Sequence, residues 1–116
     1  MSQKNIELGK LGEELAVTYL QSLGHTILFQ NYRNRFGEID IISSFEEVLY
    51  CIEVKYRTRA KQFHPLLVFN ETKQNRLRKL YYYLIKSHPP LAHLTVSFSL
   101  AHIDEKREVN FYSYLF

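Results

Sequence analysis

Residues 36–42 read Phe-Gly-Glu-Ile-Asp-Ile-Ile and, after a short polar break, residues 50–55 read Tyr-Cys-Ile-Glu-Val-Lys. Both stretches alternate apolar and charged side chains with a period of two, which is typical of strands with two different faces. On this pattern Ile39 and Ile41 share one face, and the charged side chains of both stretches share the other. The shortness of the break between the stretches predicts that they form an antiparallel hairpin.

The polar face of this hairpin carries an unusual pair of acids. If a four-residue loop spans residues 45–48, Asp40 lies opposite Glu53 and Glu38 lies opposite Lys55. Directly opposed residues have Cβ atoms roughly 4.5–5.5 Å apart, so Glu38 and Lys55 would form an ion pair, whereas the two opposed acids would repel each other. A hard divalent cation would remove that repulsion, because it takes carboxylate oxygens as ligands. An ordinary solvated face of an amphipathic hairpin is the alternative interpretation.

The composition is that of a globular chain. With 116 residues, 46% of them apolar, the chain suits one domain over residues 1–116 with one core. No apolar run reaches the roughly 18–20 residues of a membrane span, and the first residues lack the apolar core of a signal peptide. Cys51 is the single cysteine, and no two of the five histidines have zinc-like spacing, so neither a disulfide nor a zinc site is expected. We therefore expect a cytoplasmic protein without membrane contact.

Positive charge is concentrated in two stretches. The formal net charge of +3 and a pI near 9.0 are compatible with nucleic-acid binding without requiring it. Residues 55–61 read Lys-Tyr-Arg-Thr-Arg-Ala-Lys and residues 73–79 read Lys-Gln-Asn-Arg-Leu-Arg-Lys. Either stretch alone is typical of a solvated surface, but two of them beside an acidic pair favour contact with a phosphate backbone. The candidate nucleic-acid-binding residues are Arg33, Arg35, Arg57, Arg59, Lys73, Gln74 and Arg76.

Two helices are predicted outside the hairpin. The residues that recur at helical spacing over 6–23 form one apolar stripe: Leu8, Leu11, Gly12, Leu15, Tyr19 and Leu23. Gly24 follows as a C-terminal cap. The second helix begins near Asn70, a good N-cap, and ends before the prolines at residues 89–90. Small residues on one side of the first apolar stripe would let that helix approach a sheet closely: Gly9, Gly12 and Ala16.

Each helix also directs polar side chains toward the hairpin. Glu13 lies at the margin of the first apolar stripe, from which its carboxylate could reach the polar face of the hairpin. An ordinary surface glutamate is the alternative. Lys73 and Gln74 continue the buried stripe of the second helix, so their side chains are expected to point toward the sheet.

Three further strands are predicted, over residues 26–32, 94–100 and 109–114, with residues 56–69 as a loop over the site. The alternation of apolar residues with threonine and serine in 94–100 predicts a half-buried strand. A strand, a helix of this length and another strand suit a right-handed parallel crossover. The predicted fold is α/β, a mixed β-sheet flanked by helices in the order α-β-β-β-α-β-β.

These residues, taken in order, resemble a known family. Asp40, followed after twelve residues by Glu53-Val54-Lys55, resembles the D…(D/E)-x-K signature of the restriction-endonuclease-like nuclease superfamily. The whole chain is similar to the small bacterial YraN-like proteins, whose fold is akin to that of archaeal Holliday-junction resolvases. The matching motifs are Gly9-x-x-Gly12-Glu13-x-x-Ala16-x-x-Tyr19-Leu20-x-x-x-Gly24, Asn31-x-Arg33, Gly37-Glu38-Ile39-Asp40-Ile41-Ile42, Glu53-Val54-Lys55-x-Arg57 and Lys73-Gln74-x-Arg76-Leu77.

The resemblance implies a restriction-endonuclease-like fold and a role for each matching residue. Asp40 and Glu53 would be metal ligands for Mg²⁺ or Mn²⁺, with the Val54 carbonyl as a third. Lys55 would position or activate the attacking water and stabilise developing negative charge, and Glu13 matches the first-helix acid of the resolvase-like branch.

The chain departs from the family pattern at two places. Tyr56 stands where the family usually has threonine. Residues 97–100 read Ser-Phe-Ser-Leu where the family tends to show Arg-Phe-Asp-Val, which removes two charged groups.

The implied function is a divalent-metal-dependent endonuclease that hydrolyses phosphodiester bonds of DNA, with structured or branched DNA of repair and recombination as a candidate substrate. A resolvase would also need a homodimer, because two symmetric cuts require two sites. One alternative is a non-catalytic nucleic-acid-binding module with a nuclease-like fold. Another is a protein-interaction domain whose basic stretches serve solubility.

Overall fold

The computed structural model describes the backbone of residues 3–56 and 65–116 and the side chains of residues 7–56 and 67–116. The described elements follow one another as α1 (Gln3–Leu23), β1 (Thr26–Asn34), β2 (Gly37–Phe45), β3 (Val48–Tyr56), the 3₁₀ turn η1 (Pro65–Val68), α2 (Glu71–Ser87), the 3₁₀ turn η2 (Pro89–Leu91), β4 (Thr95–Ile103) and β5 (Val109–Tyr112). Most of the predicted loop over residues 56–69 lies outside the described residues.

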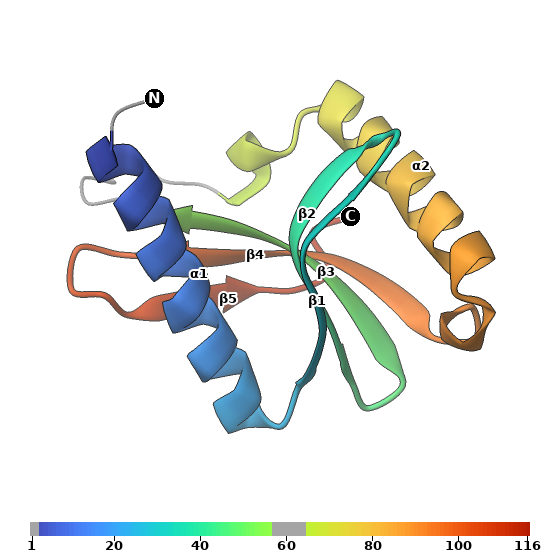
Figure 1. Cartoon of the computed structure of the whole chain (residues 1–116), viewed down its shortest axis with the longest axis horizontal. Coiled ribbons are helices and arrows are strands. Elements are labelled where there is room, and N and C mark those ends of the chain that lie inside the picture. The colour runs from blue at the N-terminus through green and yellow to red at the C-terminus, as the bar shows by residue number, and fades with distance from the viewer. Residues whose placement is uncertain (1–2, 57–64) are drawn as a thin grey trace.

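The five strands form one mixed sheet in the order β1-β2-β3-β4-β5 (Figure 1). Strands β3 and β4 are parallel, and the other neighbouring pairs are antiparallel. The parallel pair is connected through α2, because parallel strands need a crossover to bring the chain back to the same edge. The predicted α/β class, the element order and the mixed sheet are therefore confirmed.

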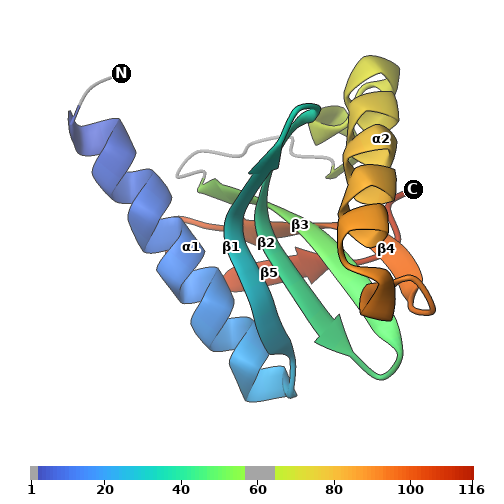
Figure 2. The same cartoon turned by 45° about the vertical axis from the view of Figure 1, so that its right-hand side comes forward.

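The two helices lie on opposite faces of the sheet (Figure 2). Leu77, Leu80 and Leu84 of α2 pack into one apolar cluster with the sheet, and Ala16 and Leu20 of α1 pack into another. Burial of apolar surface on both sides is the main favourable contribution to the fold. Among the described residues, no helix is long and apolar enough to cross a membrane.

Helix α1 approaches the sheet along a line of small side chains. Gly12, Ala16 and Leu20 are its buried residues, whereas Leu23 is 46% exposed. The sequence placed Gly9 on the same side, but Gly9 is exposed, and a Cβ there would meet no atom of the described residues within 4 Å. The buried line is therefore rotated from the predicted stripe, because close packing against the sheet favours small side chains over the larger leucines.

Helix α2 matches its prediction. The Asn70 side chain accepts a hydrogen bond of 2.8 Å from the Lys73 backbone N–H, which caps the helix. The helix ends at Ser87, ahead of the two prolines that open η2. Lys73 and Gln74 are half-buried and Arg76 is exposed, as the helical periodicity indicates.

Strand β2 does not alternate regularly. Ile39 and Ile42 contact the cluster on the α2 side, whereas Ile41 contacts the cluster on the α1 side. The prediction that Ile39 and Ile41 share a face is therefore wrong. The break falls at Asp40, and on β1 the residue opposite it, Asn31, has a φ of 53°. A left-handed residue inside a strand interrupts the two-residue repeat that the prediction assumed.

The prediction of a half-buried β4 is also wrong. Ser97 and Ser99 are fully buried, and their hydroxyl groups hydrogen-bond to each other at 2.8 Å. Strand β4 is an inner strand that pairs with β3 on one side and β5 on the other, and the Leu115 backbone N–H donates to the Phe98 carbonyl at 2.9 Å, so the C-terminal segment also lies along it. The Ser97 hydroxyl also accepts the Tyr114 backbone N–H at 2.8 Å, which satisfies this buried polar group.

Candidate active site

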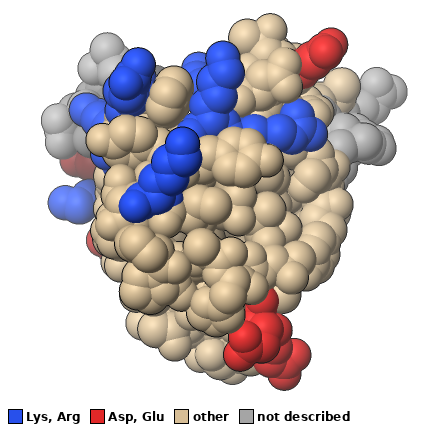
Figure 3. Space-filling view, turned by 90° about the vertical axis from the view of Figure 1, so that its right-hand side faces the viewer, with Lys and Arg blue, Asp and Glu red and all other residues tan. Residues whose placement is uncertain are grey.

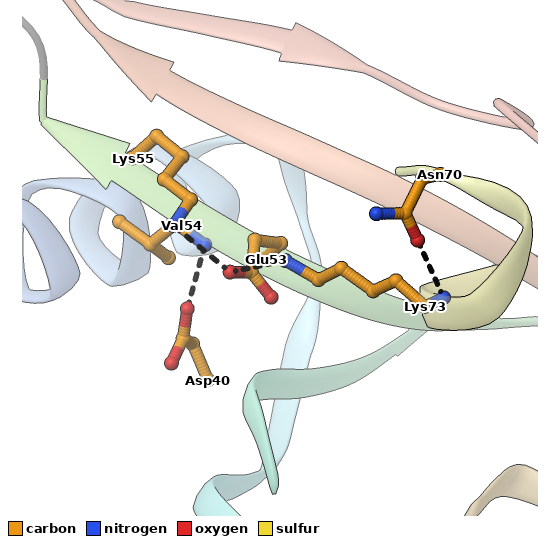
Figure 4. Close-up of polar contacts among 6 residues, drawn as sticks. All are labelled: Asp40, Glu53, Val54, Lys55, Asn70 and Lys73. Atoms are coloured by element: carbon orange, nitrogen blue, oxygen red, sulfur yellow. Dashed lines mark hydrogen bonds and ion pairs between the residues drawn. The ribbon is translucent and has the colours of Figure 1, made fainter. Parts of the chain in front are cut away.

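The hairpin register that the sequence predicts is confirmed, because Ser44 faces Leu49 and Ile41 faces Ile52. The predicted four-residue loop is wrong: Phe45 and Val48 also pair, so only residues 46 and 47 connect the two strands. The backbone ladder between β2 and β3 ends at the pair of Ile41 and Ile52. Beyond it, the Val54 backbone N–H donates a 2.8 Å hydrogen bond to Oδ2 of Asp40 (Figure 4). A side-chain carboxylate thus takes the place of a backbone acceptor where the two strands part.

Glu53 lies on the α2 side of the sheet and is held by two lysines (Figure 4). Its Oε1 lies 3.3 Å from Nζ of Lys55 on the same strand and 3.1 Å from Nζ of Lys73 on α2. Only 16% of the Glu53 side chain is exposed. Because the Asn70 cap fixes the first turn of α2, the helix end sets the position of Lys73.

Asp40 lies in an environment that disfavours its charge. Burial is the main reason that its pKa rises from 3.8 to about 6, and the negative charges of Glu53, Glu13 and Glu38 raise it further. The hydrogen bond from Val54 opposes this rise. A carboxylate that remains poorly compensated near neutral pH is typical of a site that binds a cation or performs catalysis.

Helix α1 contributes Glu13, as the sequence predicted. Asn31 of β1 donates a 3.3 Å hydrogen bond from Nδ2 to Oε2 of Glu13. Burial raises the pKa of Glu13, the hydrogen bond from Asn31 lowers it and the charge of Glu38 raises it. Asn31, a residue of β1 with a left-handed backbone, therefore contacts Glu13 of α1 and lies opposite Asp40 of β2.

The predicted ion pair between Glu38 and Lys55 is wrong. Glu38 pairs instead with Arg33 on β1, at 2.8 Å, and Lys55 contacts Glu53. The reason is that β2 and β3 separate before this point, so Glu38 remains next to β1, where Arg33 is its register partner.

The donor atoms near Asp40 suit a hard divalent cation. Among the described residues, no group of three or more His, Cys, Asp or Glu side chains could hold a metal. The predicted ligand set has only two such side chains, Asp40 and Glu53, and adds the Val54 carbonyl oxygen. Mg²⁺ is usually held by one or two carboxylates together with waters and substrate phosphates, so the set fits Mg²⁺ better than a cation that needs a full protein cage. The unfavourable burial of the Asp40 charge is the structural observation that agrees with this.

The predicted nucleic-acid-binding residues are placed unequally. Lys73 forms an ion pair with Glu53, and the Gln74 side chain donates a hydrogen bond to the Phe69 carbonyl at 3.0 Å. The Arg35 guanidinium lies 5.0 Å from the Phe36 ring, whereas Arg33 is paired with Glu38 and exposed Arg76 lies beside Gly37. Arg57 and Arg59 lie outside the described residues. On the α2 side of the molecule, Lys and Arg gather in the upper half, whereas acids lie at the lower edge and another at the upper right (Figure 3).

Sequence reasoning missed two contacts. It predicted that Lys73 binds nucleic acid, whereas Lys73 pairs with Glu53, although the helical periodicity already indicated that its side chain points toward the sheet. It also gave no role to Asn31, which appeared only as part of a motif. No periodic pattern could have identified Asn31, because its role depends on a positive φ and on the place where α1 crosses the sheet.

The two departures from the family pattern have packing explanations. Tyr56 packs under α1: a Cβ added at Gly12 would lie 3.5 Å from the Tyr56 side chain and 3.6 Å from that of Val54. The hydroxyl groups of Ser97 and Ser99 hydrogen-bond to each other inside the sheet, so these buried polar groups are paired without a charged side chain.

Comparison with known proteins places this α/β chain in a family. The profile of the uncharacterised protein family UPF0102 matches residues 12–104. A UPF0102 protein of Leptospira interrogans is 40% identical over 116 residues, which span all of both chains. One from Thermodesulfovibrio yellowstonii is 50% identical over 80 residues, 69% of this chain and 71% of the relative, and one from Coxiella burnetii is 33% identical over 103 residues, 89% and 86%. The chain belongs to the uncharacterised protein family UPF0102, and the predicted YraN-like membership is confirmed.

Proposed function

We propose that this protein is a divalent-metal-dependent endonuclease of the restriction-endonuclease-like superfamily that hydrolyses phosphodiester bonds of DNA. The observation that carries the proposal is the Asp40 carboxylate, fixed by the Val54 N–H where β2 and β3 part and lying beside a Glu53 that two lysines hold. Acids that bind a cation and a lysine next to them are the groups that phosphodiester hydrolysis requires.

Each residue has a distinct task in this proposal. Asp40 and Glu53, with the Val54 carbonyl, would hold the ion, and the Val54 N–H keeps the Asp40 carboxylate oriented. A bound Mg²⁺ or Mn²⁺ would lower the pKa of a water molecule and stabilise negative charge on the phosphate. Lys55, whose side chain is 35% exposed, would place its ammonium group against the phosphate as charge develops there.

Lys73 and Glu13 would act as positioning residues. Lys73 fixes the carboxylate of Glu53 from the opposite element, and its half-buried ammonium also lies 5.4 Å from the Phe69 ring. Glu13, held by Asn31, adds negative charge near Asp40 and so raises its pKa and strengthens the demand for a cation.

The proposal is tested by incubating labelled linear, nicked, flap and four-way DNA with the full chain in Mg²⁺ or Mn²⁺, beside Asp40→Asn and Lys55→Ala. We expect metal-dependent cleavage that both substitutions reduce at least a hundredfold, and the substrate that is cut fastest identifies the preferred structure. Equal cleavage by the wild type and both variants would indicate a contaminating nuclease and remove the proposal.

A non-catalytic nucleic-acid-binding module is the second candidate, favoured by the gathering of Lys and Arg on the α2 side (Figure 3). DNA binding without cleavage in any metal would support it. The homodimer and the cytoplasmic location stay predictions. Sedimentation of the protein with and without four-way DNA would test the dimer.

A further inference from the structure

A groove of about 320 Å³ opens between the β1–β2 turn and α2, on the α2 side of the molecule. It lies beyond the cluster around Asp40 and Glu53 and shares no lining residue with it. Its lining consists of cationic and aromatic side chains without an acid: Arg35, Phe36, Lys79, Tyr82, Tyr83 and Lys86.

The elements that form the groove are fastened to each other. Asn34, the last residue of β1, donates a 3.2 Å hydrogen bond from Nδ2 to the Leu80 carbonyl of α2, and its Oδ1 accepts the Phe36 backbone N–H of the β1–β2 turn at 3.0 Å. The side chain of Arg76 covers Gly37, where an added Cβ would lie 3.4 Å from Nε. The turn therefore presents its side chains to α2 in a defined arrangement, which lowers the ordering cost of a binding site.

The cations of the groove have no acidic partner in the part of the chain that the structure describes. Within the described part of the chain, no carboxylate lies within 4.0 Å of the charged nitrogens of Arg35, Lys79 or Lys86. Arg33, two residues before Arg35, is paired with Glu38. The positive charge that faces the groove is therefore available to an anionic ligand.

Two of the three aromatic rings that line the groove are strongly exposed. Tyr82 is 58% exposed and Tyr83 is 42% exposed, although both lie on a helix whose opposite side is buried. Phe36 meets Tyr83 edge to face, with centroids 6.2 Å apart, so one ring supports the other. Exposed rings among unpaired cations are the combination that single-stranded nucleic acid recognises, because bases stack on rings while phosphates pair with lysine and arginine.

We propose that this groove binds an unpaired nucleotide of a DNA strand, with its base against Tyr82 and Tyr83 and its phosphates against Arg35, Lys79 and Lys86. The inference rests on the proposed function for the rest of the strand: Lys73, at the candidate active site, and Tyr83 are ten residues apart on α2, about 15 Å at 1.5 Å per residue. A strand held in the groove would thus reach the Glu53 region within a few nucleotides. The substrate would then be DNA with a single-stranded segment, such as a flap or a junction arm that has opened.

The test measures the affinity of the full chain for a fluorescent oligothymidylate by anisotropy, in a buffer with chelator so that cleavage cannot contribute. We expect Tyr82→Ala combined with Tyr83→Ala to weaken binding about five- to tenfold, while Tyr82→Phe keeps it within about twofold. An abasic oligomer of the same length should bind as weakly to the wild type as oligothymidylate does to the double variant. Tyr114→Ala, which removes a tyrosine that is 55% exposed elsewhere, should leave the affinity unchanged.

Two results would overturn the inference. One is equal affinity for the abasic oligomer and oligothymidylate, because the groove would then be no more than a charged surface. The other is displacement of oligothymidylate by polyglutamate at a similar charge concentration, which would assign the groove to an acidic protein.

The proposed function is judged separately. If the tyrosine variants lose DNA binding and no DNA is cut in any metal, the inference about the groove is supported and the proposed nuclease function is rejected. If cleavage requires Asp40 but DNA binding is unchanged in the tyrosine variants, the nuclease function is supported and the inference about the groove is rejected.

Discussion

At the scale of single residues, Asp40 is the acid of the candidate site whose charged form is most disfavoured by its surroundings. Its carboxylate is mostly buried, faces other acids and, among the described residues, receives one hydrogen bond, from Val54. Glu53, in contrast, is compensated by Lys55 and Lys73. The negative charge of Asp40 therefore destabilises the cation-free protein, and a cation that binds there would stabilise it.

The cost at Asp40 predicts a pH-dependent gain in stability on its removal. Because its pKa rises from 3.8 to about 6 on folding, the folded protein retains a proton that the unfolded chain releases between about pH 4 and pH 6. The free energy of unfolding therefore loses a contribution as the pH rises through this window, and the loss is complete above about pH 6. Asp40→Asn, which still accepts the Val54 N–H, should be more stable than wild type by about 1–3 kcal/mol near pH 7.5 and by much less near pH 4.

Urea unfolding in chelator at both pH values measures this difference. Burial lowers the pKa of His25, which gives a contribution of opposite sign, but it is common to both proteins and cancels. Added Mg²⁺ should stabilise the wild type and leave Asp40→Asn unaffected. A variant that is less stable than wild type near pH 7.5 would contradict the assignment of Asp40 as a poorly compensated acid.

Lys73 makes a second prediction, on metal affinity. Its ammonium group lies 3.1 Å from Glu53 Oε1 and competes with a cation for that carboxylate. Lys73→Ala should therefore tighten Mn²⁺ binding in the absence of DNA, by about fivefold for an interaction of about 1 kcal/mol. Lys79→Ala, on the same helix but in the groove, is the matched control and should leave the affinity unchanged. Calorimetric titration with Mn²⁺ measures both, and equal affinities for Lys73→Ala and wild type would place the ion away from Glu53.

At the scale of elements, local chemistry made much of the fold predictable. The Asn70 cap, the prolines of η2 and the hairpin register each depend on residues close in sequence, so their signals are local. The faces of Ile39 and Ile41 could not be predicted, because the break in β2 accompanies a left-handed Asn31 on the neighbouring strand.

The candidate site divides in the same way. Asp40, Glu53 and Lys55 follow from the alternation of one hairpin and from the resemblance. The contact of Lys73 with Glu53 depends instead on how the crossover sets α2 against β3, and the contact of Asn31 with Glu13 on how α1 crosses β1. Sequence periodicity gives the face of an element, but not the translation of one element relative to another.

The end of α1 provides a test of element packing. Gly24 has a φ of 104°, and a Cβ there would lie 2.9 Å from the Phe45 ring. Gly24→Ala should therefore lower the free energy of unfolding by about 1–3 kcal/mol. Gly9→Ala is the matched control, since Gly9 lies inside α1 and an added Cβ would meet no described residue within 4 Å, and it should raise stability by about 0.5–1 kcal/mol. Thermal or urea unfolding of both variants decides the point. A destabilising Gly9→Ala would show that α1 contacts something at that position.

At the scale of the whole molecule, the sheet separates two different surfaces. Helices α1 and α2 lie on opposite faces of it (Figure 2). Helix α1 carries Glu13, whose charge acts on Asp40, and α2 carries Lys73, which pairs with Glu53. Further Lys and Arg side chains gather on the α2 side (Figure 3). The modest formal net charge of +3 hides this separation. Affinity for DNA should accordingly depend on which face carries the charge more than on the total.

Charge reversal on two faces tests this dependence. Lys79→Glu with Lys86→Glu alters the α2 side, whereas Lys10→Glu with Lys106→Glu alters exposed positions on α1 and the β4–β5 turn and changes the net charge by the same amount. We expect the first pair to weaken binding of single-stranded DNA at least tenfold. We also expect it to make the slope of log affinity against log salt concentration shallower by about 1.4, at about 0.7 for each lost phosphate contact.

The second pair should shift the affinity by less than about threefold at moderate salt, because exposed charges farther than the Debye length of about 10 Å from the ligand are largely screened. Anisotropy titrations of both double variants across a salt series give the slopes directly. If the two pairs weaken binding equally and with the same slope, DNA is attracted by net charge alone. The α2 face would then hold no defined path for the strand toward Asp40 and Glu53.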